Sequence, residues 1–194
     1  MSLINNKTDE ELIKEFQNGN RDAYTQLVLK YKDRIINFIY RYMGDIDVAQ
    51  DLAQETFYKL YINKDSYKQV AKFSTWLYTI AANLSKTELR KIKRRKTYTV
   101  SSLSKDDREF VLQTPASEYV DEVSDVGQAQ VLQLALLELD EEFRIIIILR
   151  EIQELSYENI SKILKLPLGT VKSRINRGKL KLREILINKG VKRI

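Results

Sequence analysis

The fold is decided by the stretch LSYENISKILKLPLGTVKSRINRGK, residues 155–179. Ser156 with Asn159 resembles an N-terminal helix cap, and an apolar stripe follows it at helical spacing. The stripe consists of Ile160, Ile163 and Leu164. Pro167 can open a second helix but cannot continue the first. The stretch therefore predicts two short helices with a tight break, which is the pattern of a helix-turn-helix.

The second of these helices is cationic on one side and apolar on the other. Val171, Ile175 and Leu182 are expected to face inward. Lys and Arg can donate to guanine edges or phosphates, and Asn can pair with adenine. The pattern favours a helix that enters the major groove over an ordinary helical hairpin with a solvated basic face. The outer side carries Lys172, Asn176, Lys179 and Arg183, with Ser173, Arg177 and Lys181 on an adjacent stripe.

Outside this stretch, composition points the same way. The 194 residues include only six Gly and two Pro, too few for the frequent turns of a β-sandwich or barrel, so an all-α fold is expected. The chain has no Cys and no His, which excludes Cys- or His-based zinc sites and nucleophiles. No apolar run is long enough to span a membrane, and the N-terminus lacks a secretion signal. A cytoplasmic protein without membrane insertion is expected.

Charge is divided into blocks along the chain. Residues 83–96 hold seven Lys or Arg against one Glu, and residues 165–194 hold ten against one. Residues 97–127 hold two against seven acidic residues. Two basic blocks suggest two contacts with a polyanion, and the alternative is two solvated helix faces.

The same blocks suggest a division into domains. Residues 9–62 show helical periodicity, with Asp45 or Asp47 as the cap of a helix from about 48 to 61. Residues 63–72 read as a loop, and a helix restarts at Phe73. We expect two helical domains, 1–96 and 128–194, joined by a flexible acidic linker over residues 97–127.

Several motifs together resemble one family. The pattern from Tyr157 to Arg174 looks like sigma region 4, and Asp51 to Phe57 looks like region 2.2. The segment from Phe73 to Asn83, followed by the basic pairs Arg90-Lys91 and Arg94-Arg95, looks like regions 2.3 and 2.4. Leu27, Tyr31 and Phe38 fit region 2.1. In this order, the chain resembles the extracytoplasmic-function group of bacterial RNA polymerase sigma factors, within the sigma-70 superfamily, over about residues 9–96 and 128–187.

This resemblance implies a function. The chain would bind core RNA polymerase, direct it to promoters with specific minus-10 and minus-35 elements, and promote strand opening. It would be no enzyme and would need no cofactor or metal. Its partners would be the β′ coiled coil and β flap of the polymerase and promoter DNA, and an anti-sigma factor stays open. Polymerase contacts would include Asp51, Gln54, Glu55 and Phe57.

The resemblance also assigns DNA contacts. Tyr67 and Phe73 are the better loop candidates for stacking on an unpaired base, whereas Trp76 and Leu77 are more typical of core packing. Asn83 would bind a base flipped from the minus-10 element. The minus-10 set is Tyr67, Phe73, Trp76, Asn83, Lys86, Arg90, Lys91 and Arg94. The minus-35 set is Thr170, Lys172, Ser173, Arg174, Asn176, Arg177 and Lys179.

The chain departs from the family pattern at three positions. The family often has Glu where this chain has Gln50 and Asp where it has Thr87. It often has Gly in the turn between the two helices, where this chain has Lys165, and a left-handed Lys costs ~1 kcal/mol relative to Gly. These departures leave the promoter sequence open. The acidic stretch 97–127 either threads toward the polymerase cleft or serves as a simple tether.

Two other functions compete with this one. A stand-alone helix-turn-helix regulator would leave the first-half motifs unexplained. An all-helical Mg²⁺ enzyme would use carboxylates such as Asp45, Asp47 and Asp51. No base, nucleophile or phosphate loop accompanies those carboxylates, so the sigma-factor reading is favoured.

Overall fold

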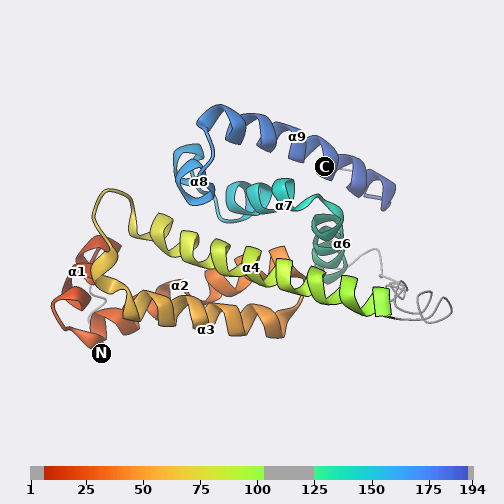
Figure 1. Cartoon of the computed structure of the whole chain (residues 1–194). Helices are drawn as coiled ribbons and strands as arrows, with labels where there is room; N and C mark the ends of the chain where they lie inside the picture. Colours follow the sequence, from red (N-terminus) through yellow and green to blue (C-terminus); the bar gives the residue numbers. More distant parts are fainter. Residues whose placement is uncertain (1–6, 103–124, 192–194) are drawn as a thin grey trace.

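The structure is a computed structural model that describes residues 7–102 and 125–191. Within these ranges every regular element is a helix, and the expectation of an all-α fold is confirmed (Figure 1). The elements are α1 (Asp9–Gln17), α2 (Arg21–Met43), α3 (Ile46–Ile62), the short 3₁₀ turn η1 (Lys64–Ser66), α4 (Phe73–Ser102), α6 (Asp125–Glu138), α7 (Glu141–Ile147), the π-helical turn η2 (Ile148–Ile152), α8 (Tyr157–Leu164) and α9 (Leu168–Asn188).

Local capping chemistry begins and ends the helices of the first half. Thr8 and Glu11 form a reciprocal capping box at α1. Asp45, rather than Asp47, caps α3, because its side chain accepts a hydrogen bond from the backbone N–H of Val48 at 3.0 Å. Gly44 ends α2 in the left-handed conformation, with φ of 83°.

Helices α1 to α4 form the first bundle. Helix α2 packs against α1, α3 and α4, and Figure 1 shows it between them. Its inward face is fully covered and aliphatic or aromatic, including Leu27, Ile35, Phe38 and Ile39. Because these side chains recur at spacings of three and four, one stripe of the helix supplies the centre of the core.

Helices α6 to α9 form the second bundle around a central apolar run. All five residues from Ile145 to Leu149 are buried, across the junction of α7 and η2. Helix α9 lies so close to α7 that a Cβ at Gly178 would stand 2.9 Å from Cγ1 of Ile147. A side chain at this position would therefore force Ile147 to shift.

The two bundles pack against each other rather than standing apart. Helix α4 lies against α8, and α2 lies against α6 and η2, so that residues of both bundles share one hydrophobic core (Figure 1). We call this contact the seam. It also contains polar links: Tyr78 donates to Gln153 at 2.5 Å, and Gln133 donates to the carbonyl of Tyr40 at 3.3 Å.

Arg144 is the central polar residue of the seam. Its guanidinium donates to the carbonyl of Tyr42 at 3.0 Å, near the end of α2. It also donates to the carbonyls of Leu137 and Leu139, at 2.6 and 3.0 Å, around the end of α6. One side chain thus satisfies carbonyl groups left free at the ends of two helices, one from each bundle.

The predicted linker boundaries differ from the structure at both ends. Helix α4 continues to Ser102, and α6 begins at Asp125, whereas the prediction placed residues 97–127 in a linker. Residues 97–102 contain neither Gly nor Pro, and extending an existing helix is much easier than starting one. The remaining part of the predicted linker, 103–124, lies outside the described residues. In the predicted loop 63–72, the structure adds the turn η1.

Candidate nucleic-acid interface

Helices α8 and α9 form a helix pair with a tight turn. The hydroxyl of Ser156 accepts from the backbone N–H of Asn159 at 3.2 Å, which confirms the cap at the start of α8. Lys165 ends this helix at φ 55° and ψ 46°, in the left-handed region. The hydroxyl of Ser161 donates to the carbonyl of Leu166 at 2.5 Å and ties the turn to the helix. The turn between α8 and α9 therefore keeps its left-handed geometry although Lys165 stands where the family often has Gly.

Helix α9 separates its apolar and cationic faces as expected. Val171 and Ile175 are buried, and Leu182 is half-buried. Lys172, Asn176, Arg177 and Lys179 are exposed, and Thr170, Ser173 and Arg174 are half-buried. All seven predicted minus-35 residues thus lie within the first twelve residues of α9, with at least part of the side chain accessible.

Several cations of α9 have carboxylate partners within their own bundle. Arg174 pairs with Glu142 at 2.6 Å, and Lys179 pairs with Glu151 at 2.9 Å. Lys181 also pairs with Asp140 at 2.7 Å. Counting charge along the chain missed these pairs, because the acidic and basic partners are more than 25 residues apart and meet only through the fold.

The predicted minus-10 cations lie along α4. Asn83, Arg90, Lys91 and Arg94 are exposed. Lys86 is half-buried, and burial, together with the charges of Arg90 and Arg174, lowers the pKa of its ammonium. Helix α4 thus exposes a cationic side, but one of its lysines is partly covered near the seam. Lys91 also pairs with Glu88 at 3.0 Å.

The two loop aromatics are placed differently from the prediction. Phe73 is the first residue of α4 and is 0% exposed, and Tyr67 is 8% exposed. Their rings lie 6.0 Å apart, and Phe73 also packs edge-on against Tyr31. The expectation that these rings stand free for stacking is wrong for this conformation, because burying them removes large apolar surfaces from water. Trp76 is only half-buried.

The predicted polymerase-binding face of α3 is largely accessible. Asp51, Gln54 and Glu55 are exposed, whereas Phe57 is 6% exposed and belongs to the core. Phe57 points inward because it lies on the same stripe as the buried residues of α3. Tyr58, which the sequence reading did not single out, is 62% exposed. Its position four residues after Gln54 was a signal that it shares that face.

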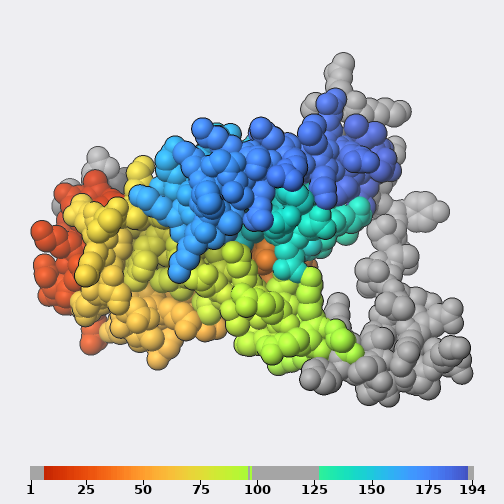
Figure 2. Space-filling model, turned by 45° about the horizontal axis from the view of Figure 1, so that its top comes forward, coloured from red at the N-terminus to blue at the C-terminus, as the bar shows by residue number. Residues whose placement is uncertain are grey.

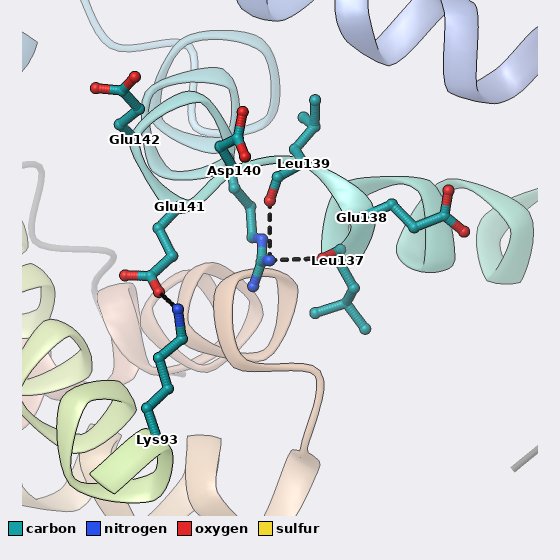
Figure 3. A pocket seen from close by; sticks show the side chains of 8 residues that line it. Lys93, Leu137, Glu138, Leu139, Asp140, Glu141 and Glu142 are labelled. Carbon is teal, nitrogen blue, oxygen red and sulfur yellow. Dashed lines mark hydrogen bonds and ion pairs between the residues drawn. The ribbon is translucent and has the colours of Figure 1, made fainter. Parts of the chain in front are cut away.

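A hollow lies where the second half of α4, at Lys93, faces the α6–α7 turn (Figure 3). It has a volume of about 560 Å³ and is bordered by Lys93, Arg144 and the segment 137–142. Lys93 and Glu141 form an ion pair across it. Among the residues that the structure describes, no group of three Asp or Glu side chains is arranged to hold a metal ion. No helix in the described ranges is long and apolar enough to cross a membrane.

Comparison with known proteins identifies both bundles. Residues 27–95 match the family model for sigma-70 region 2, and residues 129–182 match that for sigma-70 region 4. The chain is 38% identical over 176 residues to the ECF RNA polymerase sigma factor SigW of Bacillus subtilis, covering 90% of this chain and 94% of the relative. It is 34% identical to the RNA polymerase sigma-H factor of Pseudomonas aeruginosa, covering 91% and 93%.

A solved structure has the same arrangement of helices. The sigma factor RpoE of Bartonella quintana, crystallised in complex with the anti-sigma factor NepR, is 27% identical and has a TM-score of 0.67. The match covers 88% of this chain and 98% of that one. With both regions matched in order and relatives aligned over most of the chain, the protein belongs to the extracytoplasmic-function sigma factors of the sigma-70 family, which direct RNA polymerase to promoters.

Proposed function

We propose that α9 reads the minus-35 element from the major groove. The observation that carries this proposal is the exposed cationic and amide face of α9 opposite its buried stripe. Asn176 and Arg177 are free to meet base edges, and Lys172 and Ser173 lie beside them. Arg174 and Lys179 are assigned to phosphates, since the guanidinium of Arg and the ammonium of Lys both donate to phosphate oxygens of the DNA backbone. Thr170, in the first turn of α9, completes the set.

The minus-10 element is assigned to α4. Its exposed cations, Arg90, Lys91 and Arg94, attract the phosphate backbone, and the exposed amide of Asn83 can bind the edge of an unpaired base. Trp76, on the same helix as Asn83, is half-buried, so part of its ring is accessible to an unpaired base. Since Tyr67 and Phe73 are buried, we assign them to the core that positions the start of α4, and not to stacking on the unpaired strand.

Core RNA polymerase is assigned to the exposed face of α3. Asp51, Gln54 and Glu55 provide acceptors and donors, and Tyr58 adds an aromatic ring of the type enriched at interface hot spots. We assign no enzymatic activity to the chain. It would act in the cytoplasm with the polymerase. Because the Bartonella relative was crystallised with an anti-sigma factor, a protein of that class is a further proposed partner.

Use of both promoter elements requires the seam to open. Positions minus 35 and minus 10 are about 25 base pairs apart, or about 85 Å of duplex at about 3.4 Å per base pair. In this conformation α8 lies directly on α4. The 22 residues between α4 and α6 can span at most ~80 Å when fully extended, which permits a large separation of the bundles.

The test is reconstitution with purified core RNA polymerase. The chain should bind core polymerase and support run-off transcription from a subset of genomic fragments, while the isolated chain opens no promoter. Glu55→Ala with Tyr58→Ala should weaken core binding, and Glu184→Ala, an exposed acid on α9, is the matched control. If core polymerase failed to bind, or if the isolated chain opened promoter DNA unaided, the assignment would be wrong.

A further inference from the structure

Four cations of α9 are paired with carboxylates of the same bundle. Arg174 pairs with Glu142 at 2.6 Å and Lys179 with Glu151 at 2.9 Å. Further along, Lys181 pairs with Asp140 at 2.7 Å, and Lys189 pairs with Glu138. Arg174 and Lys179 are among the proposed minus-35 contacts. Carboxylates of the chain therefore already neutralise part of the positive charge that DNA phosphates would contact.

The same acidic segment reaches the other basic helix. Glu141 and Glu142 are neighbours at the start of α7, and their side chains leave in different directions (Figure 3). Glu141 pairs with Lys93 on α4, and Glu142 pairs with Arg174 on α9. Two adjacent carboxylates therefore contact cations of both helices that are proposed to bind DNA. Figure 2 shows the blue surface of the second bundle resting against the yellow-green surface of α4.

A carboxylate and a phosphate make the same kind of contact with a guanidinium or an ammonium. Affinity for duplex DNA depends on the number of phosphates that cations neutralise, and on the small ions released when they do. Arg174 and Lys179 are 28% and 50% exposed in their side chains, so a phosphate can approach both. To bind there, however, a DNA phosphate must displace the carboxylate from its ion pair. The displaced carboxylate then lies close to the phosphate and repels it.

We propose that Glu142 and Glu151 compete with DNA phosphates for Arg174 and Lys179, and so lower the affinity of the free chain for DNA of any sequence. This inference rests on the proposed function of α9 as the DNA-binding helix. The exposed side chains of Asn176 and Arg177 are left for base contacts. The carboxylates therefore weaken the sequence-independent part of DNA binding. Stable binding of the chain to a promoter then depends more on core RNA polymerase, which holds the chain against the DNA.

The test measures binding of the full-length chain to two duplexes of about 25 base pairs, one arbitrary and one containing a minus-35 element. Fluorescence anisotropy at about 50 and 200 mM salt gives both affinity and salt dependence. Glu142→Gln and Glu151→Gln should each raise the affinity for both duplexes by about two- to fivefold, the range of a surface ion pair. The salt dependence should become steeper, and the ratio between the two duplexes should stay unchanged.

Two controls separate this effect from a general change in charge. Glu138→Gln removes the same charge from an ion pair with Lys189, which lies 15 residues beyond Arg174 and outside the proposed contacts, and should change affinity little. In an Arg174→Ala background, Glu142→Gln should no longer raise affinity, because the cation that it releases is absent.

The outcomes distinguish the inference from the function on which it rests. Unchanged or weaker DNA binding by both Glu142→Gln and Glu151→Gln would overturn the inference, and so would an equal gain by Glu138→Gln. If Arg177→Ala still weakened recognition of the minus-35 duplex, the proposed function would survive that result. If Arg177→Ala and Lys172→Ala also had no effect on either duplex, the assignment of α9 itself would fail.

Discussion

The two basic helices use their charge in different ways. On α9, Arg174 and Lys179 are paired with carboxylates of the same bundle. On α4, Lys91 pairs with Glu88 in its own helix, and Lys93 pairs with Glu141 across the seam. The positive charge of α9 is therefore neutralised by carboxylates of its own bundle, whereas that of α4 is neutralised partly by a carboxylate of the other bundle. Net charge along the chain shows where cations are concentrated but not what already neutralises them.

The helices also differ in what lies beneath the cations. The proposed reading face of α9 consists of side chains that project outward from a buried aliphatic stripe. The start of α4 is instead anchored by the buried rings of Tyr67 and Phe73. The difference separates two classes of residue, those that contact DNA and those that hold a contacting residue in position, and mutations can test the separation.

The largest effect is expected from Phe73→Ala. Removing a fully buried phenyl ring should lower the free energy of unfolding by about 3–5 kcal/mol. Urea denaturation of the full chain measures it, with Val70→Ala as the control, because Val70 is 83% exposed in the loop that precedes α4 and its loss should cost less than about 0.5 kcal/mol. A stable Phe73→Ala variant that failed only in promoter opening would return Phe73 to the DNA-contact class.

Arg177→Ala and Lys179→Ala should separate base contact from phosphate contact on α9. Loss of Arg177 should reduce discrimination between minus-35 sequences by about 1–3 kcal/mol. Loss of Lys179 should weaken all sequences alike and by less, because its ion pair with Glu151 already offsets part of its charge. Competition binding with mutated minus-35 elements at two salt concentrations measures both, and equal discrimination by the two variants would contradict the placement of α9 in the groove.

Asn83→Ala should affect strand opening more than docking. The exposed amide can engage a base only after the base leaves the stack, and its loss should cost about 1 kcal/mol of open-complex stability. Permanganate reactivity of unpaired thymines reports opening on matched and mismatched templates. The mismatched template should rescue the variant in part. Normal opening of the matched promoter would make Asn83 a helix-surface residue with no role in strand capture.

The smallest effect is expected from Lys165→Gly. Lys165 adopts φ 55° in the turn between α8 and α9, where Gly is favoured by about 1 kcal/mol. The substitution should raise the free energy of unfolding by about 0.5–1 kcal/mol and leave DNA discrimination unchanged. Chemical denaturation and minus-35 competition binding check the two parts. A loss of stability would mean that the stem of Lys165 contributes packing that outweighs its backbone strain.

Sequence reasoning predicted the helices and the helix-turn-helix well, because their causes are local. The cap at Ser156, the break before Pro167 and the apolar stripe along α9 depend on residues within a few turns of one another. The faces of α9 followed from helical periodicity alone. By contrast, Phe73 and Tyr67 were misplaced, because the local pattern does not say which rings a distant helix will cover. Phe57 lies on the buried stripe of α3, so helical periodicity could have placed it in the core.

By itself, the sequence determined the all-helical fold and the residues of the proposed reading face, since propensity, capping and periodicity act over short distances. The order of the two sigma regions followed from the resemblance of the motifs to the family. Only the tertiary structure decided which charges are paired and which aromatics are buried. Arg144 meets Tyr42 across about 100 residues, and Glu142 meets Arg174 across 32. Such contacts depend on how whole helices pack, which no short segment of the chain specifies.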